Sequence, residues 1–123
     1  GWNLGNDGGK LGFTPTTTIR PRKNITATMN LEFVFSQTIR SVTLFYMKSY
    51  GEKWQGSQLG LRIFQTSTTA NDHLLNEMSI SGIHNKQTSE MYTEEVQLSE
   101  SIEPGATLRI EAVLVGGTMF KIM

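Results

Sequence analysis

Alternation of apolar and polar side chains over most of residues 25–35 is the feature that most constrains the fold. Thr26, Thr28, Asn30 and Glu32 occupy even positions, between apolar residues at every odd position. Successive side chains of a strand point to opposite faces, so this pattern is typical of a strand with one buried face. The apolar positions predicted to face the core are Ile25, Ala27, Met29, Leu31, Phe33 and Phe35.

Further short apolar segments recur along the chain, with turn signals between them. The Pro104-Gly105 and Gly116-Gly117 pairs are the clearest of these signals. Seven or eight short strands predict an all-β fold, a two-sheet antiparallel β-sandwich of the jelly-roll type. The other expected strands are residues 39–48, 59–66, 78–82, 91–98, 107–115 and 118–123. In the strand at 59–66, Leu59, Leu61 and Ile63 are expected to point inward.

Several segments differ from this regular pattern. Residues 39–48 are apolar on both faces, which predicts a central strand covered on its second side by a loop or a partner. Residues 67–73 and 84–89 are polar and are expected to be loops. Between them, Leu74, Leu75 and Met78 fit one helical turn, although a strand at 78–82 is favoured.

The chain has 123 residues, which suits a single domain spanning residues 1–123. It begins at Gly1 and stops at Met123 inside an expected strand, so we expect a domain taken from a longer protein. No apolar run approaches the ~18–20 residues of a membrane-spanning helix, and no membrane partner is expected.

Charge and cysteine content argue against several partners. Eleven basic residues balance eleven acidic ones, so no overall field attracts nucleic acid. Without cysteine the chain has no disulfide, thiolate nucleophile or thiolate metal site. Near the start, Asp7 is the one carboxylate beside Asn3 and Asn6, a weak set for Ca²⁺, so neither a metal nor another cofactor is expected.

Catalysis is not expected from the residues present. His73 and His84 lie in polar segments without the spacing of a helical metal pair, and no Gly-x-Ser-x-Gly motif occurs. Glu94 and Glu95 are neighbours, so on a strand they point to opposite sides. A small hydrolase would require one of the histidines to meet a serine and a carboxylate in one pocket.

The loop between the second and third expected strands is the candidate binding site. Sugars stack their C–H faces on exposed aromatic rings while amides and charged groups bond their hydroxyls. This loop combines aromatic and polar residues, and the polar segment at 84–87 can add partners if it lies at the same end. The predicted ligand-binding residues are Tyr50, Glu52, Lys53, Trp54, Gln55 and Asn85.

The alternative for Trp54 is a ring folded back over the end of the sandwich, because tryptophan is usually largely buried. Tyr50 likewise fits a ring that caps the core with its hydroxyl in water.

Three short pieces carry a resemblance. They are Gly1-Trp2 with Gly12-Phe13, YMKSYG at residues 46–51, and GGTMFKI at residues 116–122. With the strand layout, they resemble the C-terminal sandwich of some plant and algal SGNH-hydrolase-like proteins, and the β-sandwich accessory domains of secreted carbohydrate-active enzymes. The resemblance implies a non-catalytic, extracellular module that binds a glycan beside a catalytic domain. No catalytic residue is carried over.

Two functional hypotheses follow. The first is a carbohydrate-binding module that recognises a glycan through the aromatic and polar loop. The second is a structural or protein-interaction module in which the doubly apolar strand at 39–48 packs on a neighbouring domain or subunit.

Overall fold

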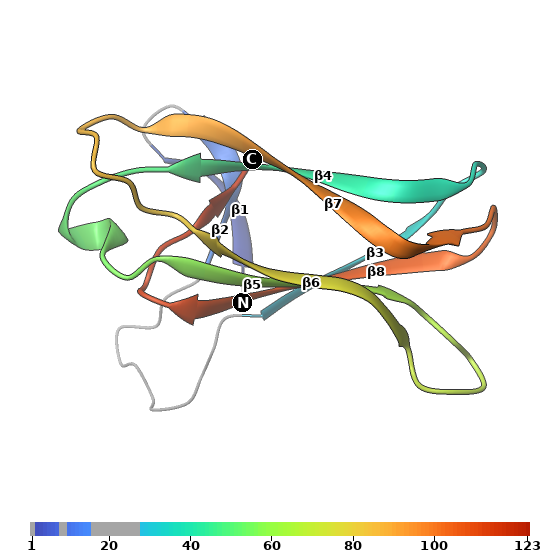
Figure 1. The fold of residues 1–123 in the computed structure, drawn as a ribbon. Coiled ribbons are helices and arrows are strands. Elements are labelled where there is room, and N and C mark those ends of the chain that lie inside the picture. The colour runs from blue at the N-terminus through green and yellow to red at the C-terminus, as the bar shows by residue number, and fades with distance from the viewer. Residues whose placement is uncertain (1, 8–9, 16–27) are drawn as a thin grey trace.

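The computed structural model describes residues 2–7, 10–15 and 28–123, with side chains from residue 28 onward. Its described part forms strands and one short 3-10 helix, η1 (Glu52–Trp54) (Figure 1). The strands are β1 (Trp2–Asp7), β2 (Lys10–Pro15), β3 (Thr28–Val34), β4 (Ile39–Lys48), β5 (Gln58–Gln65), β6 (His73–Ser81), β7 (Glu90–Ile102), β8 (Thr107–Gly116) and β9 (Lys121–Ile122).

The strands form two antiparallel sheets, which confirms the predicted all-β sandwich. One sheet has the order β1-β2-β9-β4-β7 and the other has the order β3-β8-β5-β6. The pairs β2/β9, β3/β8, β4/β7 and β5/β6 are nested like the two arms of one long hairpin. Rolling such a hairpin on itself produces the jelly roll, and the extra pairs β4/β9 and β5/β8 close it.

Several predicted boundaries are wrong because strand pairing extends the strands into polar sequence. Strand β6 begins at His73, which pairs with Gln65, so residues 74–77 are strand and not a helical turn. Strand β7 continues to Ile102, beyond the predicted end at residue 98. Strand β9 has only two residues, and the described residues form nine strands.

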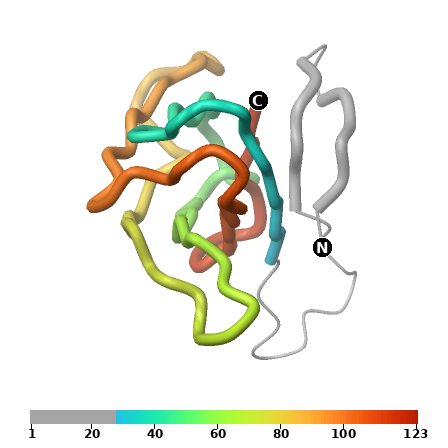
Figure 2. The backbone as a smooth tube through the Cα atoms, turned by 90° about the vertical axis from the view of Figure 1, so that its right-hand side faces the viewer, coloured from blue at the N-terminus to red at the C-terminus, as the bar shows by residue number. Residues whose placement is uncertain are grey.

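The core lies between the two sheets. Seen along the strands, the backbone from residue 28 onward winds around a common interior (Figure 2). Strand β5 contributes Leu59, Leu61 and Ile63, which alternate inward as predicted and are almost fully buried. The other buried members of the core are Tyr46, Leu75, Ile80, Val96, Ile102, Leu108, Ala112, Leu114, Phe120 and Ile122.

The prediction that the odd positions of residues 25–35 face the core is wrong at the end of this segment. Met29 and Leu31 are half-buried, but Phe33 and Phe35 are each 38% exposed. Strand β3 is an edge strand that ends at Val34, and the two rings stack on each other at this end, with centroids 5.9 Å apart. The predicted inward positions Ile25 and Ala27 lie outside the described residues.

Strand β4 is central, as its doubly apolar pattern predicted. It lies between β9 and β7, and Val42, Leu44 and Tyr46 face the core. On its outer face Met47 is buried, whereas Phe45 is 45% exposed.

The end of the chain closes the roll. Phe120 is fully buried and stacks on Tyr46, with ring centroids 5.8 Å apart. Gly82 leaves the space for this ring, because a Cβ there would lie 2.9 Å from its Cδ2 atom. The Ser57 hydroxyl donates a hydrogen bond to the carbonyl of Met119 and fixes the approach to β9.

We predict that Phe120→Ala lowers the free energy of unfolding by about 3–5 kcal/mol, because it removes a fully buried ring and leaves a cavity. Phe45→Ala is the matched control, since it deletes the same atoms from a ring that is 45% exposed. Urea denaturation of both variants measures the difference. Equal losses would contradict the role given to Phe120.

Candidate functional site

The predicted binding loop connects β4 to β5 and contains η1, at one end of the sandwich (Figure 1). Tyr50 is 45% exposed, and Glu52, Lys53 and Gln55 are also exposed. These side chains therefore lie at the surface, as the loop prediction required.

The prediction that Trp54 presents an exposed ring is wrong, because its side chain is only 5% exposed. The loop folds back on itself: the Trp54 N–H donates to the Gly51 carbonyl at 3.1 Å, and the Ser57 N–H donates to the Trp54 carbonyl at 3.1 Å. This compact turn directs the indole inward. Trp54 cannot serve as an exposed stacking platform, and Tyr50 is the exposed aromatic ring of the loop.

The loop that carries Asn85 lies beside this one. The Ser49 N–H donates to the Gly82 carbonyl and the His84 N–H donates to the Ser49 carbonyl, both at 3.0 Å. Asn85 is exposed. The structure therefore brings the two predicted loops together, whereas the other polar segment, residues 67–73, lies at the opposite end of the sandwich, after β5 (Figure 1).

A polar network fills the base of the second loop. His84 is partly buried, and its Nδ1 lies 3.2 Å from the Tyr92 hydroxyl while Nε2 donates to the Thr88 carbonyl. The Tyr92 hydroxyl is also within 3.3 Å of Glu90 Oε2. Hydrogen bonds from Thr88 and then Lys86 lower the pKa of the Glu90 carboxyl. His84 is thus a structural residue of the loop and not a solvated one.

The two histidines do not meet. His73 begins β6 at the other end of the sandwich, where Nε2 lies 3.5 Å from Glu100 Oε1. Within residues 28–123, no group of three or more histidine or acidic side chains could hold a metal ion. Nor is any helix of the described chain long and apolar enough to cross a membrane.

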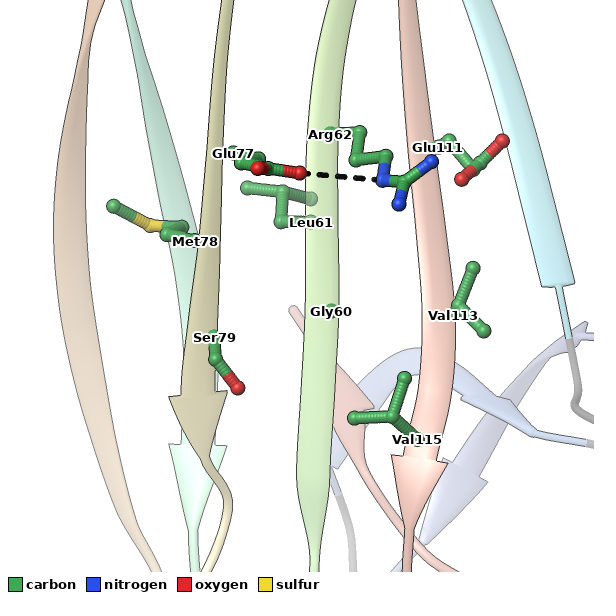
Figure 3. A pocket seen from close by; sticks show the side chains of 9 residues that line it. All are labelled: Gly60, Leu61, Arg62, Glu77, Met78, Ser79, Glu111, Val113 and Val115. Atoms are coloured by element: carbon green, nitrogen blue, oxygen red, sulfur yellow. Dashed lines mark ion pairs between the residues drawn. The ribbon is translucent and has the colours of Figure 1, made fainter.

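A second candidate site lies on the outer face of the four-stranded sheet. It is a pocket of about 530 Å³ across β6, β5 and β8 (Figure 3). Leu61 and Met78 contribute to its lining although they also pack on the core. The remaining lining residues are Gly60, Arg62, Glu77, Ser79, Glu111, Val113 and Val115.

The register of the three strands creates the hollow. One row across the sheet pairs Ser79 with Gly60 and Gly60 with Val113, so its middle position has no side chain. In a strand such a glycine allows another group to approach the backbone closely. Here a Cβ on Gly60 would lie 3.3 Å from Val115 Cγ1. The floor of the pocket is therefore backbone and valine methyl groups.

The next row forms a charged wall. Glu77 pairs with Arg62 and Arg62 pairs with Glu111. Three long charged side chains therefore stand beside the row that has Gly60 at its middle. Arg62 Nε lies 3.4 Å from Glu77 Oε2, and Figure 3 shows the guanidinium between this carboxylate and Glu111. Apolar floor and charged wall thus meet within one pocket.

Glu111 has a different environment from Glu77. Its side chain is 23% exposed, compared with 60% for Glu77. Its neighbour Arg109 reaches it only at 3.5 Å, because the shorter contacts of that guanidinium go to Asp72 at 3.0 Å and Asn30 at 2.8 Å. The Glu111 carboxylate keeps much of its capacity to accept hydrogen bonds.

The sequence prediction missed this pocket. The available signal was Gly60, because an isolated glycine inside an expected strand often marks a close approach of another group. Its partners Ser79 and Val113 are distant in the sequence, so the row becomes visible only once the strand register is known.

Comparison with known proteins gives no relative: no family model, no curated protein and no solved structure matches this chain. The resemblance to the sandwich of SGNH-hydrolase-like proteins therefore stays a prediction.

We predict that Trp54→Ala lowers the free energy of unfolding by about 3–5 kcal/mol, because a buried ring is lost. Tyr50→Ala should cost less than about 1 kcal/mol, as expected for a largely exposed side chain. Chemical denaturation followed by circular dichroism measures both. A small loss for Trp54→Ala would mean that its ring is exposed in solution.

A second prediction concerns pH. Because its pKa is lowered in the folded state, ionised Glu90 stabilises the fold above its ordinary pKa, and this stabilisation is lost as the pH falls through the lowered value. Glu90→Gln should therefore melt below the wild type at neutral pH, and the gap should close on acidification. Thr88→Ala should reproduce part of this difference in melting temperature, since the Thr88 hydrogen bond contributes most to lowering the pKa of Glu90. A gap that widens in acid would contradict the assignment.

Proposed function

We propose that this chain is a non-catalytic carbohydrate-binding module and that the pocket on the four-stranded sheet holds the sugar. The observation that carries the proposal is the meeting of an apolar floor and a charged wall in one pocket of about 530 Å³. This volume falls within the ~300–1,000 Å³ range of small-ligand pockets.

The chemistry of a sugar ring matches this combination. Its C–H face is apolar, whereas its hydroxyls are directional donors and acceptors that lose water on binding and require partners. Val113, Val115 and the Gly60 backbone offer contacts for the C–H face. The carboxylates and guanidinium of the wall, and the Ser79 hydroxyl, offer partners for the sugar hydroxyls.

The pocket is a better candidate than the predicted loop. With Trp54 buried, the loop retains one exposed ring, Tyr50, beside the exposed Glu52, Gln55 and Asn85. We keep this loop as the rival position for the same ligand class. Non-catalytic binding is favoured because His73 and His84 lie at opposite ends of the sandwich (Figure 1).

A second candidate function is packing on a neighbouring domain or subunit. The outer face of the five-stranded sheet supports it, because Phe45 is 45% exposed and Met91 is 59% exposed. Met91 pairs with Met47, two residues along β4 from Phe45, so these side chains are diagonal neighbours on one face. A neighbouring catalytic domain is one partner that such an apolar patch would suit.

A glycan-array screen of the wild type beside two site variants tests the first proposal. Gly60→Leu places a side chain in the pocket, whereas Tyr50→Ala removes the exposed ring of the loop. Thr43→Leu, at an exposed position on the other sheet, is the matched control for an added leucine. Circular dichroism first confirms that every variant has the fold of the wild type.

We expect Gly60→Leu to lose at least about tenfold in affinity, the equivalent of one lost contact of ordinary strength, while Tyr50→Ala and Thr43→Leu bind like the wild type. Binding lost only in Tyr50→Ala would move the site to the loop. A well-folded wild type that binds no glycan would overturn the proposal and favour the packing function.

A further inference from the structure

We infer that the pocket selects sugars by charge, and that it favours a sugar with a protonated amine over a neutral one and disfavours a uronic acid. This inference rests on the proposed function and names the ligand class of the same pocket. It follows from how the three charged side chains of the wall are paired with one another.

The wall carries more negative than positive charge. Glu77 and Glu111 are two carboxylates, and Arg62 is the one cation among the residues that line the pocket. A ligand that brings a positive charge therefore balances the wall, whereas a ligand that brings a carboxylate adds to the excess. Charges that meet in a partly enclosed site interact more strongly than they would in bulk water.

The cation of the wall is already engaged. Arg62 Nε lies 3.4 Å from Glu77 Oε2, and the guanidinium points across the sheet between the two carboxylates (Figure 3). A ligand carboxylate would have to compete with Glu77 for this guanidinium and would approach Glu111 at the same time. A carboxylate on each side of Arg62 therefore reduces the attraction of this guanidinium for a ligand acid.

Glu111 is the group that would hold an amine. Its side chain is 23% exposed, so water screens it less than it screens Glu77, which is 60% exposed. Arg109 neutralises it only weakly, at 3.5 Å, because the same guanidinium bonds Asp72 and Asn30 and lies over the Phe64 ring at 4.2 Å. An ammonium group in the pocket would gain a charge-assisted hydrogen bond to this carboxylate.

A preference for acidic sugars would require a different arrangement of these residues. An acid-binding pocket requires a guanidinium or ammonium that is not already paired, and Arg62 and Arg109 both contact carboxylates. Each arginine already has an acid of the protein beside it, so the excess carboxylate of the wall favours a donor-rich ligand.

The test uses three trisaccharides with one backbone, the β-1,4-linked trimers of glucose, glucosamine and glucuronic acid. Isothermal titration measures each against the wild type at a pH where the amine is protonated and the carboxylate is ionised. Charge-assisted hydrogen bonds predict that the glucosamine trimer binds roughly tenfold tighter than the glucose trimer, with the glucuronic acid trimer weakest. The preference should shrink at high salt, because part of the wall is exposed.

Two matched variants locate the effect. Glu111→Gln should bring the glucosamine and glucose trimers to within about twofold of each other, whereas Glu77→Gln, the more exposed carboxylate, should change the preference less. Thermal melting confirms that each variant is folded. A preference that survives Glu111→Gln, or that disappears only in Glu77→Gln, would overturn the assignment to Glu111.

The outcomes also separate this inference from the proposed function. Equal binding of the glucose and glucosamine trimers, lost in Gly60→Leu, would overturn charge selection while supporting a sugar pocket. Tightest binding of the glucuronic acid trimer would overturn it as well. If the array and all three trimers show no binding to the folded wild type, both proposals fail together.

Discussion

Closure of the roll by the last few residues is the constraint on which the rest of the structure depends. Strand β9 has only two residues, so backbone pairing with β2 and β4 contributes little to closure. The fully buried Phe120 ring, stacked on Tyr46, provides what the short strand cannot. Burial of a phenylalanine is worth a few kcal/mol, a large part of the stability of a small domain.

This closing contact also fixes one end of the sandwich. Gly82 faces the Phe120 ring, and its carbonyl accepts the Ser49 N–H, so the two loops beside β4 and β6 are tied to the core. The pocket depends on a different feature, the register of β6, β5 and β8, which aligns short side chains beside long charged ones. The scaffold and the candidate site therefore respond to different substitutions.

The sequence was sufficient to predict features that depend on local alternation. The inward positions of β5 were predictable because period-2 patterns report burial directly, and the central place of β4 was predictable because both of its faces are apolar. It could not settle Trp54, whose burial depends on how a nine-residue connection folds back onto the sandwich. Nor could it predict the pocket, since Gly60 and Val113 become neighbours only through strand register.

Mapping of a bound oligosaccharide by amide chemical shifts tests the central claim most directly. The isotope-labelled wild type is titrated with a sugar that the array identifies, and each backbone amide reports its own surroundings. The account predicts that the largest shifts cluster at Gly60, Arg62 and Val113, on the outer face of the four-stranded sheet. Shifts confined to the loop around Tyr50, or to the face that carries Phe45, would contradict it.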